Sequence, residues 1–186
     1  VLWNDTEYKA ALVAKMLQRI GREDVPVFVS PATPLPQGYR RAQERWQNDF
    51  SLSDYSGEIV REQICARMRD IIVKEKERVC IFGLGPNTTL AQLCTRYPEV
   101  KANSYVYAMG GAIHGKYWDQ DRVIGEYNIG VDAESARTVF ACGWDYTLLP
   151  LDVCADLRMQ GETYRAFLKK DTVFANIIKE NYRVWI

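Results

Sequence analysis

The apolar run of residues 79–82 (VCIF), followed at once by GLGP at 83–86, constrains the fold more than any other part of the chain. A continuous apolar run that ends at a glycine turn predicts a strand buried on both faces, as in parallel sheets covered by helices. A short helix to about Arg96 and a second strand over 104–108 follow. The order strand, turn, helix, strand is typical of α/β proteins.

The rest of the chain continues this alternation. Helical spacing of apolar residues predicts a helix that ends near Gly21, with caps offered by Asn4, Asp5 and Thr6 and a capping box completed by Glu7. The other expected elements are a strand over 25–29 with Pro26 at its start or on an edge, a long irregular connection over 30–56, a helix with Val60, Ile64, Met68, Ile71 and Ile72 on one face, a solvated charged helix end at 74–78, a helix over 133–142 capped by Asp132, a strand over 146–149, and helix or loop from about 163.

We therefore predict an α/β domain with an open, mostly parallel, Rossmann-like sheet flanked by helices. In such sheets, ligands bind at the carboxyl ends of the strands. Two glycine-containing loops follow predicted strands, at 83–89 and at 109–115, and both are candidate site loops.

Composition excludes several classes of partner. The 186 residues carry 24 Lys plus Arg and 24 Asp plus Glu, so the net charge of zero gives no electrostatic reason to expect nucleic acid or an anionic membrane. No segment approaches the roughly 20 apolar residues of a membrane helix.

The five cysteines are widely spaced, without a C-x-x-C pair, and are interpreted as reduced and structural; this favours a cytoplasmic protein. Residues 1–3 (VLW) read like the end of a buried strand, which suggests a cut or processed start.

The GLG segment at 83–85 superficially suggests a dinucleotide-binding loop. Thr88 occupies the position of the third glycine of G-x-G-x-x-G, and no G-K-[ST] of a P-loop follows. A dinucleotide-dependent enzyme is therefore disfavoured, and a tight strand-to-helix turn that needs glycine is the simpler interpretation.

A polar pair at Glu126 and Asn128 offers more. If this segment is extended, alternation places both side chains on one face. A carboxylate accepts from hydroxyl groups and an amide both donates and accepts, so the pair suits a sugar. Met109 precedes two glycines, which allow a ligand to approach backbone N–H groups. Surface polarity at 126–128 is the alternative interpretation, and an ordinary turn is the alternative at 109–111.

Three further positions have a structural and a functional interpretation. Asp132 is interpreted mainly as a helix cap. Asp119 and Asp121 form a D-x-D pair that can bind metal or simply be solvated. His114 is the only histidine, and a loop histidine without a visible partner is usually incidental.

These segments become specific in combination, because they occur in the order found in inosine–uridine nucleoside hydrolases. The chain resembles that family at GREDVPV (21–27), GPNTTLA (85–91), MGGA (109–112), EYNI (126–129), Asp132 before the predicted helix, and LPLDV (149–153). The corresponding family patterns are G-R-x-D-I-P-V, G-P-L-T-N-L-A, E-F-N-I, D-P-E-A-A and L-D-V-T.

The resemblance implies an open α/β fold and hydrolysis of the N-glycosidic bond of ribonucleosides to ribose and free base. It implies a calcium ion, held by an aspartate cluster, that binds the ribose diol and the attacking water, and an aspartate that takes the proton from that water. Carried over by position, Thr88 would offer its backbone carbonyl to calcium. Met109, Glu126 and Asn128 would line the ribose pocket, with Glu126 on the 5′-hydroxyl and Asn128 on the ring diol.

The chain departs from the family in both catalytic regions. The family's D-x-D-P-G-x-D-D motif would lie upstream of Val1 and its His-Asp pair after Ile186, and no catalytic residue is assigned here. The stretch between Met109 and Glu126 is longer than usual and offers Gly115-Lys116 or Gln120 where a Gly-Asn is expected. Two hypotheses follow for this partial domain of residues 1–186. The first is a calcium-assisted nucleoside hydrolase, commonly a homo-oligomer. The second is an inactive homologue that serves as a structural or interaction subunit of a larger assembly.

Overall fold

The computed structural model describes residues 5–31, 37–114 and 125–185. They form two compact units, one of residues 63–158 and one that combines residues 1–62 with 159–186. Each unit is described by itself. The predictions at residues 1–3, at Asn4, at Gly115-Lys116, at Asp119, Gln120 and Asp121 lie outside the described residues.

The unit of residues 63–158 is built on a parallel three-stranded sheet with the order β3-β4-β5. Val79 pairs with Ser104, and Val106 pairs with Tyr146. The sheet confirms the predicted open parallel α/β architecture. The elements of this unit are α3 (Ile64–Lys74), β3 (Val79–Gly83), α4 (Thr88–Arg96), η2 (Pro98–Lys101), β4 (Ser104–Met109), α5 (Tyr127–Gly130), α6 (Ala133–Ala141), β5 (Tyr146–Leu149) and α7 (Leu151–Cys154).

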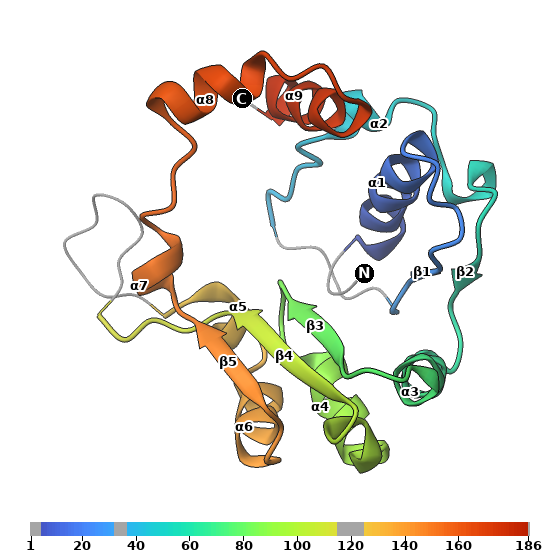
Figure 1. Cartoon of the computed structure of the whole chain (residues 1–186), viewed down its shortest axis with the longest axis vertical. Helices are drawn as coiled ribbons and strands as arrows, with labels where there is room; N and C mark the ends of the chain where they lie inside the picture. Colours follow the sequence, from blue (N-terminus) through green and yellow to red (C-terminus); the bar gives the residue numbers. More distant parts are fainter. Residues whose placement is uncertain (1–4, 32–36, 115–124, 186) are drawn as a thin grey trace. The chain divides into compact units, whose positions relative to one another are not determined.

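Helices α4 and α6 lie on the same side of this sheet (Figure 1). Leu93, Val100, Val106 and Val139 are almost completely buried between the helices and the strands. Full burial of an aliphatic side chain contributes about 1.5–3 kcal/mol, so these four contacts hold the helices on the sheet.

The prediction that residues 79–82 are buried on both faces is wrong. Val79 and Ile81 pack against the core cluster, whereas Phe82 is 69% exposed. Successive side chains of a strand point to opposite faces, and the core cluster on the Ile81 side includes residues of α3, α4 and α6. Phe82 and Tyr107 stack on the other face, with ring centroids 6.2 Å apart.

The predicted helix around 60–72 begins four residues later than its first apolar position. Val60 belongs instead to strand β2 (Ile59–Val60), which pairs in parallel with β1 (Val27–Phe28). The Val60 carbonyl accepts from the Val29 amide at 2.9 Å, and the Val60 side chain is buried. The predicted strand at 25–29 is confirmed over Val27–Phe28 only, with Pro26 just before its first residue. The charged end at 74–78 is exposed, as expected.

The other unit contains α1 (Thr6–Arg19), and its N-terminus differs from the prediction. Asp5 occupies the N-cap position without a side-chain cap bond, because its carboxylate accepts from Arg41 instead. Glu7 pairs with Arg61 at 2.9 Å. The predicted capping box includes Asn4 and therefore lies outside the described residues.

The long connection after residue 30 is pinned to this unit's core. Its Trp46 is buried and donates to Glu180 at 3.0 Å, and Lys15 donates to the Trp46 carbonyl at 2.7 Å. The remaining elements of the unit are α2 (Glu44–Gln47), η1 (Leu52–Asp54), α8 (Gly161–Leu168) and α9 (Val173–Trp185).

The five cysteines are free thiols, as predicted. Burial raises the pKa of Cys94 to about 11, so this thiol stays protonated and acts as a core side chain. Across the described ranges, every helix is too short or too polar to cross a bilayer.

Candidate functional site

The carboxyl ends of β3, β4 and β5 bring together most of the predicted site residues. Thr88 begins the helix after β3, Met109 ends β4, and Glu126, Asn128 and Asp132 lie in the segment that precedes α6. Parallel strands place these ends at one edge of the sheet. We call this region the carboxyl edge.

The two glycines after β4 allow the backbone to pass close to Glu126. Gly111 has φ +74°, a conformation that favours glycine. A Cβ atom on Gly110 would lie 3.3 Å from the Ile129 side chain and 3.5 Å from Glu126 Oε2. Close packing against Ile129 and Glu126 therefore favours glycine at 110, and the backbone conformation favours it at 111.

Glu126 is the centre of the carboxyl edge, although not in the extended segment that alternation suggested. That expectation is wrong, because Tyr127–Gly130 forms the helical turn α5 with Glu126 as its N-cap. Glu126 Oε1 accepts from the Asn128 amide at 2.8 Å, and Oε2 accepts from the Gly111 amide at 2.9 Å and the Ile129 amide at 3.0 Å. The side chain is 4% exposed. Three amide donors compensate the burial of this carboxylate.

Asn128 lies beside Glu126 for a different reason than the one predicted. Its Nδ2 donates to the Met109 carbonyl at 3.1 Å and lies 3.4 Å from Met109 Sδ. The helical turn, rather than strand alternation, brings Glu126 and Asn128 to the same loop. The three predicted ribose contacts, Met109, Glu126 and Asn128, thus form one hydrogen-bonded cluster.

Thr88 and Asp132 form a second cluster at the carboxyl edge. Thr88 Oγ1 donates to Asp132 Oδ2, and Asp132 Oδ1 accepts from the Ser135 amide at 3.1 Å. Burial raises the pKa of Asp132, but the hydrogen bonds from Thr88 and Ser135 lower it more, so the pKa is below its ordinary value. Asp132 is the predicted helix cap, and its bond to Thr88 is an additional contact that the sequence pattern did not reveal.

Sequence reasoning missed a polar contact between Asn87, which precedes α4 at the carboxyl edge, and Tyr146, the first residue of β5. Asn87 is 3% exposed, and its Oδ1 accepts from the Tyr146 hydroxyl at 3.2 Å. Burial raises the pKa of Tyr146, and the bond to Asn87 opposes that rise. The only sequence signal was that Asn87 stands where the resembled family has leucine.

Asp152 binds the backbone of the loop after β4. It lies in α7, so LPLDV is a strand end followed by a helical turn. Its oxygens accept from the backbone amides of Ile113 at 2.9 Å and His114 at 2.7 Å. These two amides lower the pKa of Asp152. The backbone of His114 is thereby fixed at the carboxyl edge.

The metal prediction rests on Thr88 alone among the described residues. No three His, Cys, Asp or Glu side chains of the described ranges lie close enough together to hold an ion. Calcium takes six to eight oxygen ligands, so these residues by themselves do not fit a calcium site.

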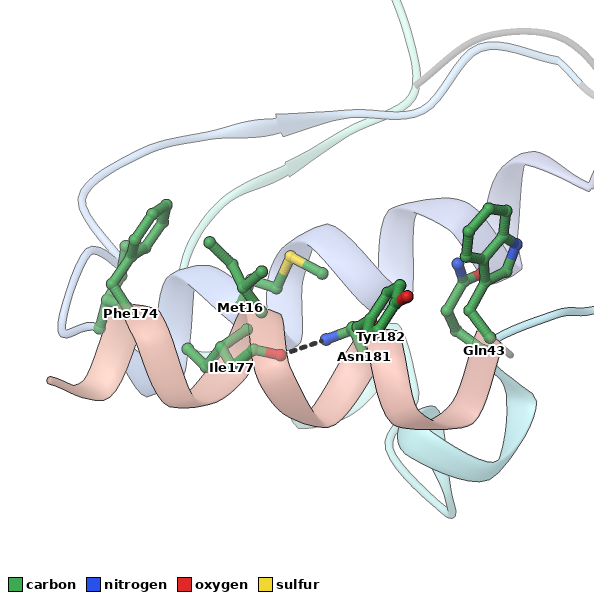
Figure 2. Close-up of a pocket in the computed structure, with 9 residues that line it drawn as sticks. Met16, Gln43, Phe174, Ile177, Asn181 and Tyr182 are labelled. Carbon is green, nitrogen blue, oxygen red and sulfur yellow. Dashed lines mark hydrogen bonds between the residues drawn. The ribbon is translucent and has the colours of Figure 1, made fainter. Parts of the chain in front are cut away.

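A separate concave surface lies between α1 and α9 (Figure 2). Its volume is about 360 Å³, and apolar side chains such as Met16, Phe174 and Ile177 line it. Asn181, one of its polar residues, donates to the Ile177 carbonyl at 2.9 Å. Its lining, as far as the described residues show it, includes no carboxylate, histidine or cysteine.

Comparisons with known proteins identify the family and the fold. A family model described as inosine-uridine preferring nucleoside hydrolase matches residues 3–185. The non-specific ribonucleoside hydrolase RihC of Salmonella paratyphi B is 28% identical over 159 residues, which make up 82% of this chain and 51% of the relative. The chain thus spans about half the length of the curated relatives it matches.

Solved structures show the same fold. The plant nucleoside hydrolase PpNRh1 has a TM-score of 0.75 and 19% identity, over 97% of this chain and 58% of that one. The purine-preferring ribonucleoside hydrolase from Gardnerella vaginalis has a TM-score of 0.73 and 19% identity, over 97% and 59%. The open parallel α/β arrangement of this chain is the one seen in nucleoside hydrolases.

Proposed function

Because the chain belongs to the inosine-uridine preferring nucleoside hydrolase family, we propose that it hydrolyses the N-glycosidic bond of ribonucleosides to ribose and a free base. In this reaction the bond between C1′ and the base nitrogen breaks, the water oxygen bonds to C1′, and the departing base takes up a proton. The observation that carries the proposal is the cluster of Met109, Glu126 and Asn128 at the carboxyl edge.

Glu126 is suited to accept a hydrogen bond from a ribose hydroxyl, which we propose is the 5′-hydroxyl. Its Oε2 already accepts two amide bonds, whereas the structure gives Oε1 one, from Asn128. A carboxylate oxygen accepts about two hydrogen bonds, so Oε1 has capacity for a hydroxyl. The three amides fix the direction of that lone pair, which reduces the entropy lost on binding.

Asn128 and Met109 complete the proposed ribose contacts. The Asn128 amide nitrogen is directed to the Met109 carbonyl, which fixes the amide plane and leaves Oδ1 to accept from the ring diol. Met109 contributes its flexible apolar side chain to the wall of the pocket. The developing positive charge of an oxocarbenium-like ribose is favoured beside the negative charge of Glu126.

Calcium remains part of the proposal through Thr88, whose backbone carbonyl would be one ligand. Since the described residues do not build a complete calcium site, the ribose contacts proposed for Glu126, Asn128 and Met109 do not depend on the ion. When bound, such an ion would make a water molecule a better nucleophile at neutral pH. We further propose that residues 1–186 form one partial nucleoside hydrolase-like domain. The protein is proposed to be cytoplasmic and to form a homo-oligomer or to be a subunit of a larger complex.

Base release provides the direct test. The chain is incubated with inosine or uridine, with calcium or with a chelator, and free base is measured by chromatography. Release of free base supports the proposal. If a chelator abolishes that release and calcium restores it, the reaction depends on calcium. Comparison of inosine with 5′-deoxyinosine tests Glu126, because the deoxy substrate lacks the proposed partner of Oε1 and should bind more weakly.

A folded chain that releases no base under either condition would contradict the proposal. That outcome would favour the second hypothesis, a non-catalytic homologue that serves as a structural or interaction subunit. Circular dichroism on the same samples establishes that the chain is folded.

A further inference from the structure

Residues 126–132 connect the end of strand β4 with the start of helix α4. At the start of the segment, Glu126 accepts from the Gly111 amide, just after β4, and Asn128 donates to the carbonyl of Met109, the last residue of β4. At its end, Asp132 accepts from the hydroxyl of Thr88, the first residue of α4. The segment is therefore attached at both ends, once to the end of β4 and once to α4.

The part between the two attachments is hydrogen-bonded and short. The Gly130 amide donates to the Glu126 carbonyl at 2.9 Å, and the Val131 amide donates to the Tyr127 carbonyl at 3.0 Å. A closed helical turn transmits the position of one end to the other better than an open loop, since its backbone dihedrals are fixed. Displacement of Asp132 should therefore displace Asn128.

Asp132 makes more contacts than a helix cap needs. A cap accepts from a backbone amide of the first turn, and the Ser135 amide satisfies that role through Oδ1. Asp132 Oδ2 is used for Thr88, on a different helix. The two bonds together make Asp132 a tie between α6 and α4.

We propose that Asp132 is a positioning residue, which holds Glu126 and Asn128 in place for ribose through its bond to Thr88. The inference rests on the proposed function. Asp132 does not itself contact the substrate. It acts through α5, and its loss weakens binding of the ribose more than it slows the chemical step.

Replacement of Asp132 by serine separates the two roles. Serine is a good N-cap and can still accept from the Ser135 amide, but it is too short to reach Thr88. We expect Asp132→Ser to raise KM for inosine about ten-fold, with kcat changed less than about two-fold. Asp132→Asn keeps the length and should recover most of the loss, since the Thr88 hydroxyl can accept from its amide.

Thr138→Val is the matched control. The Thr138 hydroxyl also bonds on α6, to the Glu134 carbonyl at 3.0 Å, but it ties no second helix. This variant should keep the KM of the unmodified chain. Amide exchange gives a readout without activity: in Asp132→Ser the amides of Asn128 and Ile129 should exchange faster, whereas the amide of Ser135 should not.

Asp132→Ser with an unchanged KM and unchanged exchange at Asn128 would overturn the proposal and leave Asp132 as a cap only. If Asp132→Ser does not fold, Thr88→Val, which removes the hydroxyl that Asp132 accepts from and keeps the backbone carbonyl, decides by the same two measurements. A larger change in KM than in Thr138→Val then supports the proposal, and an equal KM overturns it. An unmodified chain that releases no base would contradict both the proposed function and the positioning role. An active unmodified chain whose Asp132 variants keep its KM would contradict the positioning role alone.

Discussion

The three carboxylates at the carboxyl edge are stabilised differently from four carboxylates of the other unit. At the carboxyl edge of residues 63–158, Glu126, Asp132 and Asp152 accept from backbone amides and a hydroxyl. In the other unit, carboxylates are paired with arginine: Asp5 with Arg41, Glu7 with Arg61, Asp24 with Arg22, and Glu180 with Arg19.

The difference concerns the charge that remains. An arginine cancels the charge of its partner and ties two elements together, whereas an amide or hydroxyl donor fixes a carboxylate and leaves it negative. The carboxyl edge therefore keeps negative acceptors in defined positions, as recognition of sugar hydroxyls or of a cationic transition state requires. The arginine pairs of the other unit have the geometry of structural contacts.

Glu126→Gln should have the largest effect. The substitution replaces one acceptor oxygen by an NH₂ group, which leaves a buried amide of Gly111, Asn128 or Ile129 without its partner. Loss of a charged hydrogen bond costs about 1.5–3 kcal/mol, so we expect kcat/KM for inosine to fall about a hundred-fold. Steady-state kinetics measures the fall in kcat/KM, and thermal unfolding measures the loss of stability caused by the unpaired amide.

Glu134→Gln, at an exposed position of α6, is the control for this substitution and should change neither quantity. If Glu126→Gln and Glu134→Gln behave alike, the buried carboxylate is no more important than a surface one, and the distinction drawn between the two units fails.

Asp152→Asn should have a smaller, local effect. The two amides that Asp152 binds belong to Ile113 and His114, and asparagine can accept from only one of them. We expect faster amide exchange at these two residues, measured by NMR, and no change at the α6 amides. Asp156→Asn, an exposed position just after α7, is the control.

Acid should reproduce this effect in the unmodified chain. The amides of Ile113 and His114 hold the pKa of Asp152 below its ordinary value. The contribution of the carboxylate is therefore present above the ordinary pKa and is lost as the pH falls through the lowered one. If these two amides lost their protection from exchange already above pH 5, ionised Asp152 would not be the group that protects them.

Sequence reasoning found the right residues at the carboxyl edge and partly the wrong geometry. Glu126 and Asn128 were expected to alternate along an extended segment, but a single helical turn brings them together, and four residues carry no periodicity that could distinguish the two. The bond between Thr88 and Asp132 joins residues 44 positions apart. No local pattern predicts such a contact.

The same limit explains the error at Val60. This residue stands four positions before Ile64, so it fits a helical face, and only pairing with the distant Phe28 shows that it is in a strand. The parallel sheet itself was predictable, because strands β3, β4 and β5 are separated by helices long enough to cover a face. The exposure of Phe82 was not, since four apolar residues in a row do not show which face is covered.

Glu180→Gln should have a modest effect on the other unit. Hydrogen bonding to Arg19 lowers the pKa of Glu180 to about 2, against the opposing effect of burial, and the Trp46 indole adds a further bond. Both side chains of the pair are about a third or more exposed, so solvent screening reduces the contribution to no more than about 1 kcal/mol. A lowered pKa means that this stability is present above about pH 4.5 and is lost as the pH falls toward 2.

Urea unfolding of Glu180→Gln and the unmodified chain at pH 7 and pH 3 measures this contribution. The two should differ at pH 7 and converge at acid pH, and added salt should reduce the difference at pH 7. A difference that grows at acid pH would mean that Glu180 stabilises the fold by another route than its ion pair.

Asp24→Asn should have the smallest effect, and it sharpens the comparison within the arginine pairs. Asp24 and Arg22 are two residues apart, joined at 2.8 Å, and their side chains are 66% and 55% exposed. The pair ties no distant elements together, because both residues belong to the same turn, and water screens its charges. We expect an unfolding midpoint equal to that of the unmodified chain within measurement error. Glu180, in contrast, joins α9 to α1 and Trp46. If Glu180→Gln lowers the stability and Asp24→Asn does not, an arginine pair of this unit stabilises the fold through the elements that it connects. Equal losses of stability in the two variants would assign the effect to charge alone.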